Sequence, residues 1–462
     1  MKVHNSVPGV RFNTMARSLA TIAILLPALL MLSGCMNTHA VCEDEERVLS
    51  AVRERTATVK PEDRLTVPGT VELADGLSEA EAVQLALCNN AAFQELLTDL
   101  ELAHSDLIQA GLLPNPEFFY VFPAGGKPFK YLVDFPVDSL VLRPLRKRAA
   151  EADVERTRER LTQAGLDLAR DARLAYADWV FARDRVLIAE ANRKLRDRIN
   201  SLTEARLKAG DATPLEESTA RIDILRARQE ETRAINDLPV FEERLRNVAG
   251  LGLFRPDLIP EKSEPAPVVA TNVDELSAEA IATRPDIASA HRAIEAAEAR
   301  IRLAKLGWLR ILGIGDSTSG SQGYRLSPGF RVGIPIFNWN QGAIARGEAE
   351  RDKAIRQLDT FQQRVALEVR QAHALHVQAA SDYRQWTDSI RPTVEEAVRR
   401  ADNTYKEGGT SLLLVLETSR QMIDTRFREA QLRADLLKTW AELERSVGRK
   451  LLGNESCFGI ER

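Results

Sequence analysis

Apolar and polar positions follow the same series twice along this chain, which predicts a duplicated protein. Each half begins with a short amphipathic segment, at about residues 77–90 and 276–284, and continues into a helix-patterned stretch, AAFQELLTDLELAHSDLIQAG or PDIASAHRAIEAAEARIRLAK. A strand-rich stretch, a long helix, a glycine turn and a return helix then follow in both halves. The offset between the halves is 408 − 210 = 198 positions, because Gly210 matches Gly408.

Proline positions predict helices far longer than those of an ordinary globular domain. No proline occurs between Pro144 and Pro214, between Pro335 and Pro392, or after Pro392. Proline breaks helices because it lacks a backbone N–H, and these gaps therefore permit uninterrupted helices. A helix over residues 145–206 would be roughly 90 Å long at 1.5 Å per residue, which is too long for a compact domain.

A different pattern, with a period of two, precedes each long helix. Tyr131, Val133 and Phe135 share one face of a predicted strand whose other face is charged. We expect this strand to pair with an aromatic one at residues 118–122, in a first hairpin at about residues 116–138.

A second hairpin is expected at about residues 309–337, with strands at 309–315 and 324–337 joined by a Ser/Gly-rich loop. Tilted strands of about 9–11 residues cross a bilayer. Two hairpins cannot close a barrel, and lipid tolerates no open sheet edge, so a membrane interpretation requires several copies of the chain. The alternative is a small soluble sheet that caps a helical bundle.

The N-terminus has the pattern of a bacterial secretion signal. Basic residues precede a mostly apolar run at residues 18–34, which ends in Leu32-Ser33-Gly34-Cys35 and resembles the lipobox of bacterial lipoproteins. The resemblance implies that Cys35 becomes the lipidated first residue, carrying palmitate among other chains, and Met36 after it favours the outer membrane. An uncleaved anchor or an ordinary signal peptide is the alternative.

Composition and motifs give no support to catalysis or nucleic-acid binding. The net charge is −4, and charged residues make up 28% of a chain with only 6% aromatics, a mixture that favours long helices. No nucleophile–base set or phosphate-binding loop is evident, and we expect no enzyme activity and no cofactor besides the lipid. His373 and His376 lack a third metal ligand, so no metal site is predicted.

Three further cysteines leave a disulfide open. One pair could bridge in an oxidising periplasm, and Cys42 with Cys457 ranks before any pair with Cys88 because both lie in terminal tails. A basic cluster follows the first hairpin and comprises Arg143, Arg146, Lys147 and Arg148, with Arg346 near the matching place of the second half. These residues could line the junction between the sheet and the helices, or they could form a solvated helix face.

Several motifs, in this order and duplicated, resemble the TolC-type outer-membrane efflux channels from about Leu77 to Gly448. They are Gln109-Ala110-Gly111-Leu112-Leu113-Pro114-Asn115-Pro116, Thr283-Arg284-Pro285-Asp286-Ile287, Gly333-Ile334-Pro335-Ile336-Phe337-Asn338, and Tyr405 to Gly408 leading into Leu413 and Glu417. The resemblance implies a mainly α fold with a small β part. Duplicated long antiparallel helices would form a trimeric α-barrel, and four strands per subunit would contribute to a 12-stranded transmembrane β-barrel.

The resemblance also implies partners and a gate. The turns at Gly210 and at Gly408 and Gly409 would receive a periplasmic adaptor protein, coupled to an inner-membrane pump of the resistance-nodulation-division type. Acidic residues just past the turns, Glu216 and Glu417, would narrow the tunnel. The remaining gate residues would be Tyr405 and Leu414.

This sequence departs from the family pattern at the gate. Leu414 and Thr410 stand where some members carry an acidic residue and a basic partner, and residues 412–415 could instead close the tip by apolar contact. A solvated helix face is the alternative for Glu216 and Glu417.

The expected domain organisation follows from these features. It comprises a signal peptide at 1–34, a lipidated tail at 35–75, a first repeat at 76–255 with its helical turn at about 208–214, a linker at 256–272, a second repeat at 273–450 with its turn at about 406–412, and a tail at 451–462.

The sequence therefore predicts a trimeric outer-membrane exit duct that conducts substrates passively and extends into the periplasm. The alternative is a periplasmic lipoprotein scaffold of coiled-coil helices without a transport role. The cargo, whether metal ions, drugs or solvents, and the identity of the pump stay open.

Overall fold

A computed structural model describes residues 38–56, 76–121, 130–252, 258–261, 272–309, 311–320, 323–407 and 412–451. The chain divides into two units, Met1–Glu46 and Arg47–Arg462. The described residues of the first unit begin helix α2 (Thr38–Thr56), whose remainder belongs to the second unit. The sequence predicted only a tail for this region, and Cys35 lies outside the described residues.

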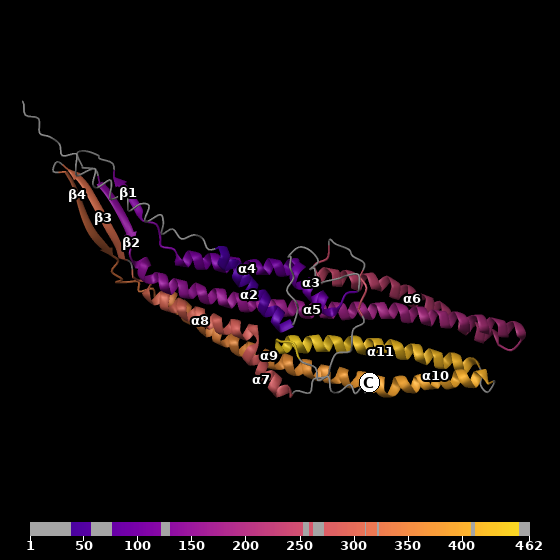
Figure 1. The fold of residues 1–462 in the computed structure, drawn as a ribbon. Coiled ribbons are helices and arrows are strands. Elements are labelled where there is room, and N and C mark those ends of the chain that lie inside the picture. Colours follow the sequence, from indigo (N-terminus) through magenta and orange to yellow (C-terminus); the bar gives the residue numbers. More distant parts are fainter. Residues whose placement is uncertain are drawn as a thin grey trace, which may run out of the picture. The chain divides into compact units, whose positions relative to one another are not determined.

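Each half of the second unit shows the predicted series of elements (Figure 1). The first half contains α3 (Glu79–Asn89), α4 (Ala91–Gly111), β1 (Glu117–Val121), β2 (Lys130–Pro136), α5 (Asp138–Ala209) and α6 (Pro214–Val248). The second half contains α7 (Val273–Thr283), α8 (Pro285–Leu306), β3 (Ile311–Gly320), β4 (Gly323–Val332), α9 (Gln341–Gln385), a π-helical turn (Trp386–Ile390), α10 (Arg391–Lys406) and α11 (Leu412–Val447).

The long helices are longer than the prolines predicted. The 72 residues of α5 include Pro144, and they extend over about 108 Å. Pro144 removes one backbone hydrogen bond near the start of the helix, but α5 packs against α4, α6, α8 and α11, and this packing stabilises the helix beyond its local propensity. In the second half, the π-helical turn ends just before Arg391 and Pro392. It contains Asp388, whose carbonyl would accept a hydrogen bond from the backbone N–H of residue 392 if that residue were not proline.

In the second hairpin, the first strand is longer and the second strand ends earlier than the sequence predicted. Strand β3 runs to Gly320 and so includes residues 316–320, which were predicted as loop, and β4 ends at Val332 rather than at Phe337. Ladder hydrogen bonds between β3 and β4 pair the backbone through the Ser/Gly-rich stretch. Such pairing outweighs the weak strand propensity of serine and glycine.

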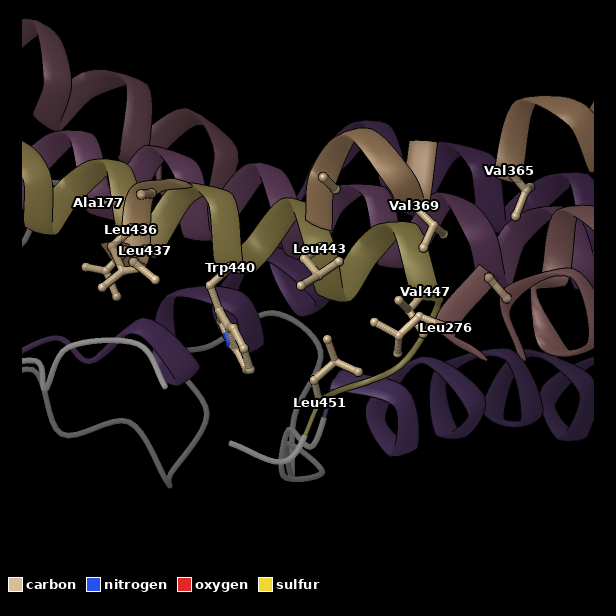
Figure 2. Close-up of a cluster of buried hydrophobic side chains, with 14 of the residues drawn as sticks. Ala177, Leu276, Val365, Val369, Leu436, Leu437, Trp440, Leu443, Val447 and Leu451 are labelled. Atoms are coloured by element: carbon tan, nitrogen blue, oxygen red, sulfur yellow. The ribbon is translucent and has the colours of Figure 1, made fainter. Parts of the chain in front are cut away.

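The hydrophobic core is divided among helix faces. In the second half, side chains from α5, α7, α9 and α11 meet in one cluster (Figure 2). Its fully buried members include Leu276, Val369, Leu443 and Val447. The first half has a cluster of α2, α3, α4 and α5 that includes Val48 and Val52, so the end of α2 belongs to the core of the second unit.

The same junction is built twice at the ends of the return helices. Asn90, between α3 and α4, donates from Nδ2 to the Val248 carbonyl at 2.9 Å, and Arg284, between α7 and α8, donates from Nη1 to the Ser446 carbonyl at 2.9 Å. The two acceptors are 446 − 248 = 198 positions apart. Each side chain satisfies a carbonyl that the end of a helix leaves without a partner.

None of the described helices is long and apolar enough to cross a membrane.

Candidate functional site

The turn between α5 and α6 requires glycine for its backbone rather than for space. Gly210 has φ +84°, and a Cβ atom added to it would have no atom within 4 Å beyond those of its chain neighbours. Its N–H donates to the Leu207 carbonyl at 3.1 Å, and the Asp211 N–H donates to the Arg206 carbonyl at 2.8 Å. This is a Schellman ending with glycine in the left-handed conformation, and it lies between the end of α5 at Ala209 and the start of α6 at Pro214.

Glu216 lies one turn into α6, where it caps the helix. Its carboxylate accepts hydrogen bonds from the Thr213 N–H at 2.7 Å and the Thr213 hydroxyl at 3.1 Å, while the Glu216 N–H donates back to the Thr213 hydroxyl at 3.2 Å. The backbone hydrogen bond and then the hydroxyl bond lower the pKa of Glu216. In a single chain, Glu216 is therefore engaged in a capping box, and its role in a gate stays a prediction.

The second predicted turn is described only at its two sides. Gly408, Gly409 and Thr410 lie outside the described residues. Tyr405 in α10 and Leu414 in α11 are exposed to 42% and 49%. Glu417 is exposed and lies 3.7 Å from Arg420 in an ion pair along the helix.

Both turns lie at the same end of the paired helices α5 and α11. Arg445 donates to Asp167 at 2.7 Å, and Phe181 packs on Phe427 with ring centroids 6.0 Å apart. Residue numbers thus rise along α5 while they fall along α11, and the helices are antiparallel. The end of α5 is consequently at the same end as the start of α11, as the sequence predicted for the two glycine turns.

An ionic seam between the halves was not predicted from the sequence. Arg284 is only 2% exposed, and it donates to Asp286 at 2.5 Å and to Glu368 at 2.9 Å. Arg445 joins Glu368 at 2.7 Å and also contacts Asp167. We define these five residues as the ionic seam, which links α5, α8, α9 and α11.

The arginines around Glu368 together affect its pKa more strongly than its burial does. Burial alone would raise the pKa of Glu368, but hydrogen bonds and charges from Arg284, Arg445 and Arg364 hold the pKa of this carboxyl below its ordinary value. The motif Thr283-Arg284-Pro285-Asp286 was the only sequence signal for the seam, and its partners are far apart along the chain.

The strands form one four-stranded antiparallel sheet in the order β1-β2-β3-β4, with the two hairpins joined through β2 and β3. The register places Phe118, Val133, Phe135 and Phe330 on one face, because Phe118 pairs with Val133 and Gly313 pairs with both Phe135 and Phe330. These four side chains are 37–77% exposed.

The other face of the sheet carries the charged side chains, together with Phe119 and Leu132. Among the strand residues whose side chains are described, every charged one lies there, namely Glu117, Asp134 and Arg331. Asp134 is buried, and its Oδ2 lies 3.7 Å from Nη1 of Arg331. An exposed apolar face opposite the face that carries the charges is the pattern of a sheet between lipid and water.

The remaining candidate residues have structural surroundings. His376 is fully buried, with its ring against Trp440 at a centroid distance of 5.2 Å and Nδ1 3.3 Å from the Thr439 hydroxyl. In the described part of the chain, no group of three metal-ligating side chains gathers. Cys88 is buried with a free thiol, and the pair Cys42 and Cys457 falls outside the described side chains.

Two helical hairpins that continue into a sheet with an apolar outer face define a membrane channel protein. Comparison with known proteins identifies the family: the model for "Outer membrane efflux protein" matches residues 144–251 and 276–449. The chain belongs to this family, whose members are of TolC type. Family and fold are those of channel proteins rather than enzymes.

Curated relatives and solved structures agree with this assignment. Nodulation protein T of Rhizobium leguminosarum bv. trifolii is 25% identical over 393 residues, which cover 80% of this chain and 81% of the relative. The cobalt-zinc-cadmium resistance protein CzcC of Cupriavidus metallidurans is 23% identical over 404 residues, which cover 82% and 91%. The outer membrane protein VceC of Vibrio cholerae has the same fold, with a TM-score of 0.64 and 15% identity over 80% of this chain and 96% of that one.

Proposed function

We propose that three copies of this chain form an outer-membrane exit duct, to which each copy contributes four strands of a 12-stranded β-barrel and four long helical segments of an α-barrel. The sheet is the observation that carries this proposal. Its apolar face is exposed, and in the described part of the chain β1 and β4 each pair with one strand only. Lipid tolerates no open edge, and closure around a common axis satisfies both outer strands.

Strand lengths support the same arrangement. Strands β3 and β4 each have 10 residues, which is the length that crosses a bilayer at a tilt of about 45°. The helices then extend into the periplasm, since about 108 Å of α5 cannot fit in a membrane about 30 Å thick. A lipid on Cys35 would add a second attachment to the outer membrane.

The turn at one end of the helices would dock an adaptor protein. Gly210 leaves open space at the turn, and Leu215 beside it is 75% exposed. Gly408 and Gly409 would form the second docking turn of each subunit. Energy would come from an inner-membrane pump, and the tip would open at Tyr405, Leu414, Glu216 and Glu417 to let cargo pass.

The relatives leave the cargo open. One is named for nodulation and another for resistance to cobalt, zinc and cadmium, so membership of the family does not select a substrate. The described helices contribute no group of metal-ligating side chains that would favour ions.

The scaffold alternative is not favoured. A periplasmic scaffold would bury its apolar strand residues in a protein core, whereas Phe118 is 65% and Phe330 is 77% exposed.

Channel formation is testable directly. The full chain, extracted in detergent from outer-membrane fractions, is expected to have the mass of three subunits and to produce ion conductance in planar bilayers. A monomer in the soluble fraction, or a membrane-bound protein without conductance, would refute the duct.

A further inference from the structure

Exposed apolar side chains gather at the end of the sheet where the helices begin. All four chain connections between helices and strands meet at this end, since β1 starts beside the end of β2, and β3 starts beside the ends of β2 and β4. We define the apolar collar as the exposed apolar residues of these connections and of the first turn of α5: Leu112, Leu113, Leu140, Val141, Ile334, Ile336, Phe337 and Trp339. Phe337 is 92% exposed.

The collar is held in place by α8. Asn340 adopts φ +67° and donates from Nδ2 to the Ala304 carbonyl at 2.7 Å, which satisfies a carbonyl at the end of α8. Trp339, beside it, packs on Trp308 with ring centroids 5.8 Å apart. Tryptophan at this position suits the boundary between lipid and water, where its ring is apolar and its N–H is wet.

Basic residues follow the collar on the helices. The last six residues of α4 and α8, with the first eleven of α5 and the first seven of α9, contain only two acidic residues, Asp106 and Asp138. The same stretches contain seven basic ones: Arg143, Arg146, Lys147, Arg148, Arg302, Lys305 and Arg346. Lys147, Arg302 and Arg346 form ion pairs with Glu151, Glu298 and Glu350 on the same helices. The positive charge that no such pair neutralises is therefore carried by Arg143, Arg146, Arg148 and Lys305.

Three of these basic side chains, Arg143 and Arg148 on α5 and Lys305 on α8, are exposed and have no hydrogen-bond or ion-pair partner among the described residues. Counted from the start of α5 at Asp138, the two arginines lie about 7 and 15 Å beyond the strands at 1.5 Å per residue. Arginine side chains extend toward an interface while their charge stays in water, which brings both within reach of lipid headgroups.

We propose that the apolar collar and these arginines form a binding surface for anionic phospholipids of the periplasmic leaflet. This inference rests on the proposed function, because it requires the sheet to lie in a membrane. Trp339, Phe337 and the other collar residues contact the ends of the acyl chains, while Arg143 and Arg148 neutralise headgroup phosphates. Zwitterionic lipids satisfy the collar, but a cationic group in their headgroup offsets the phosphate and weakens its attraction to the arginines. The surface therefore selects for net negative charge.

Tryptophan fluorescence provides a local test. Trp308 and Trp339 lie at the collar, whereas the other three tryptophans, Trp179, Trp386 and Trp440, lie within helices α5 to α11 away from the sheet. The purified full chain is reconstituted in bilayers that contain brominated phosphatidylglycerol or brominated phosphatidylcholine at equal mole fraction. Bromine quenches only nearby tryptophans, so quenching reports which lipid occupies the collar.

The wild-type chain is expected to be quenched more strongly by the anionic lipid. Arg143→Gln with Arg148→Gln should lower this preference by about fivefold for each charge removed, and raised salt should lower it as well. The matched control is Arg221→Gln with Arg226→Gln in α6, which removes two exposed charges far from the sheet and should leave the preference unchanged.

The possible failures are distinguishable. Equal quenching by both lipids in the wild type, or an unchanged preference in the Arg143 and Arg148 variant, overturns the lipid-binding surface and leaves the duct intact. Absence of quenching by either lipid shows that the collar is not at a membrane, and it overturns the duct together with the surface.

Discussion

Replacing Arg284 by methionine should destabilise the folded chain more than any exposed arginine would. Methionine keeps most of the apolar stem of arginine, so the change removes the charge and its hydrogen bonds with little loss of packing. Arg284 is 2% exposed and donates to Asp286, to Glu368 and to the Ser446 carbonyl. Without it, two carboxylates of the ionic seam lose a partner and a buried carbonyl loses its donor.

The magnitude follows from burial. Breaking a buried ion pair by removal of one partner costs about 3–5 kcal/mol, and the lower value applies because Arg445 still contacts Glu368. An exposed pair contributes less than about 1 kcal/mol. Arg400→Met is the matched control, since Arg400 contacts Glu396 at 2.7 Å with side chains 79% and 50% exposed.

Equilibrium urea unfolding of the detergent-solubilised chain, followed by far-ultraviolet circular dichroism, measures both costs. A double-mutant cycle of Arg284→Met with Glu368→Gln should show a coupling energy of about 1–3 kcal/mol. If Arg284→Met costs no more than Arg400→Met, the ionic seam does not stabilise the packing of α8, α9 and α11, and the reasoning is wrong.

Three further predictions concern the turn, the thiol and acid. Gly210→Ala should destabilise the chain by about 1–2 kcal/mol through its positive φ alone. Gly250→Ala should destabilise it more, because a Cβ there would lie 2.3 Å from the Asn89 carbonyl oxygen. The midpoints of urea unfolding measure the stability of both variants. Burial raises the pKa of Cys88 to about 11, so its thiol should resist a thiol reagent at pH 8 until urea unfolds the chain. Peptide mapping separates Cys88 from the other cysteines, and rapid labelling of Cys88 in the native protein would contradict the structure. The pKa of Glu368 is lowered on folding, so its stabilisation is present above the unfolded value of about 4.3 and is lost as pH falls through the folded pKa. Glu368→Gln should therefore flatten the acid side of the stability profile, and an unchanged profile would exclude this carboxyl as its cause.

The regular elements were largely predictable because each has a local signal. Helix α4 begins and ends where its apolar period does, at Ala91 and Gly111, and Gly250 and Gly448 end the return helices with positive φ. Pro144 and the Ser/Gly-rich part of β3 misled the prediction of boundaries, since long-range packing and strand pairing outweigh local propensity.

The ionic seam could not be predicted, although one of its motifs was recognised. Arg284 and Arg445 meet the carboxylate of Glu368 only after α8, α9 and α11 have packed together. Arg284 and Glu368 are 84 residues apart along the chain. The capping role of Glu216 was missed for a different reason. Thr213 and Glu216 carry the local spacing of a capping box, but the acidic residue was interpreted only as a gate residue or as part of a solvated helix face.

Closure of the sheet between neighbouring chains can be measured by cysteine cross-linking. Within one chain, β1 and β4 are separated by two strands, or about 14 Å, and a disulfide needs Cα atoms less than about 7 Å apart. Chains carrying Phe118→Cys with Phe330→Cys or Val332→Cys should therefore cross-link only to neighbours, and oxidised outer membranes should yield covalent trimers. Monomers at every pair of positions would contradict a barrel closed by three copies.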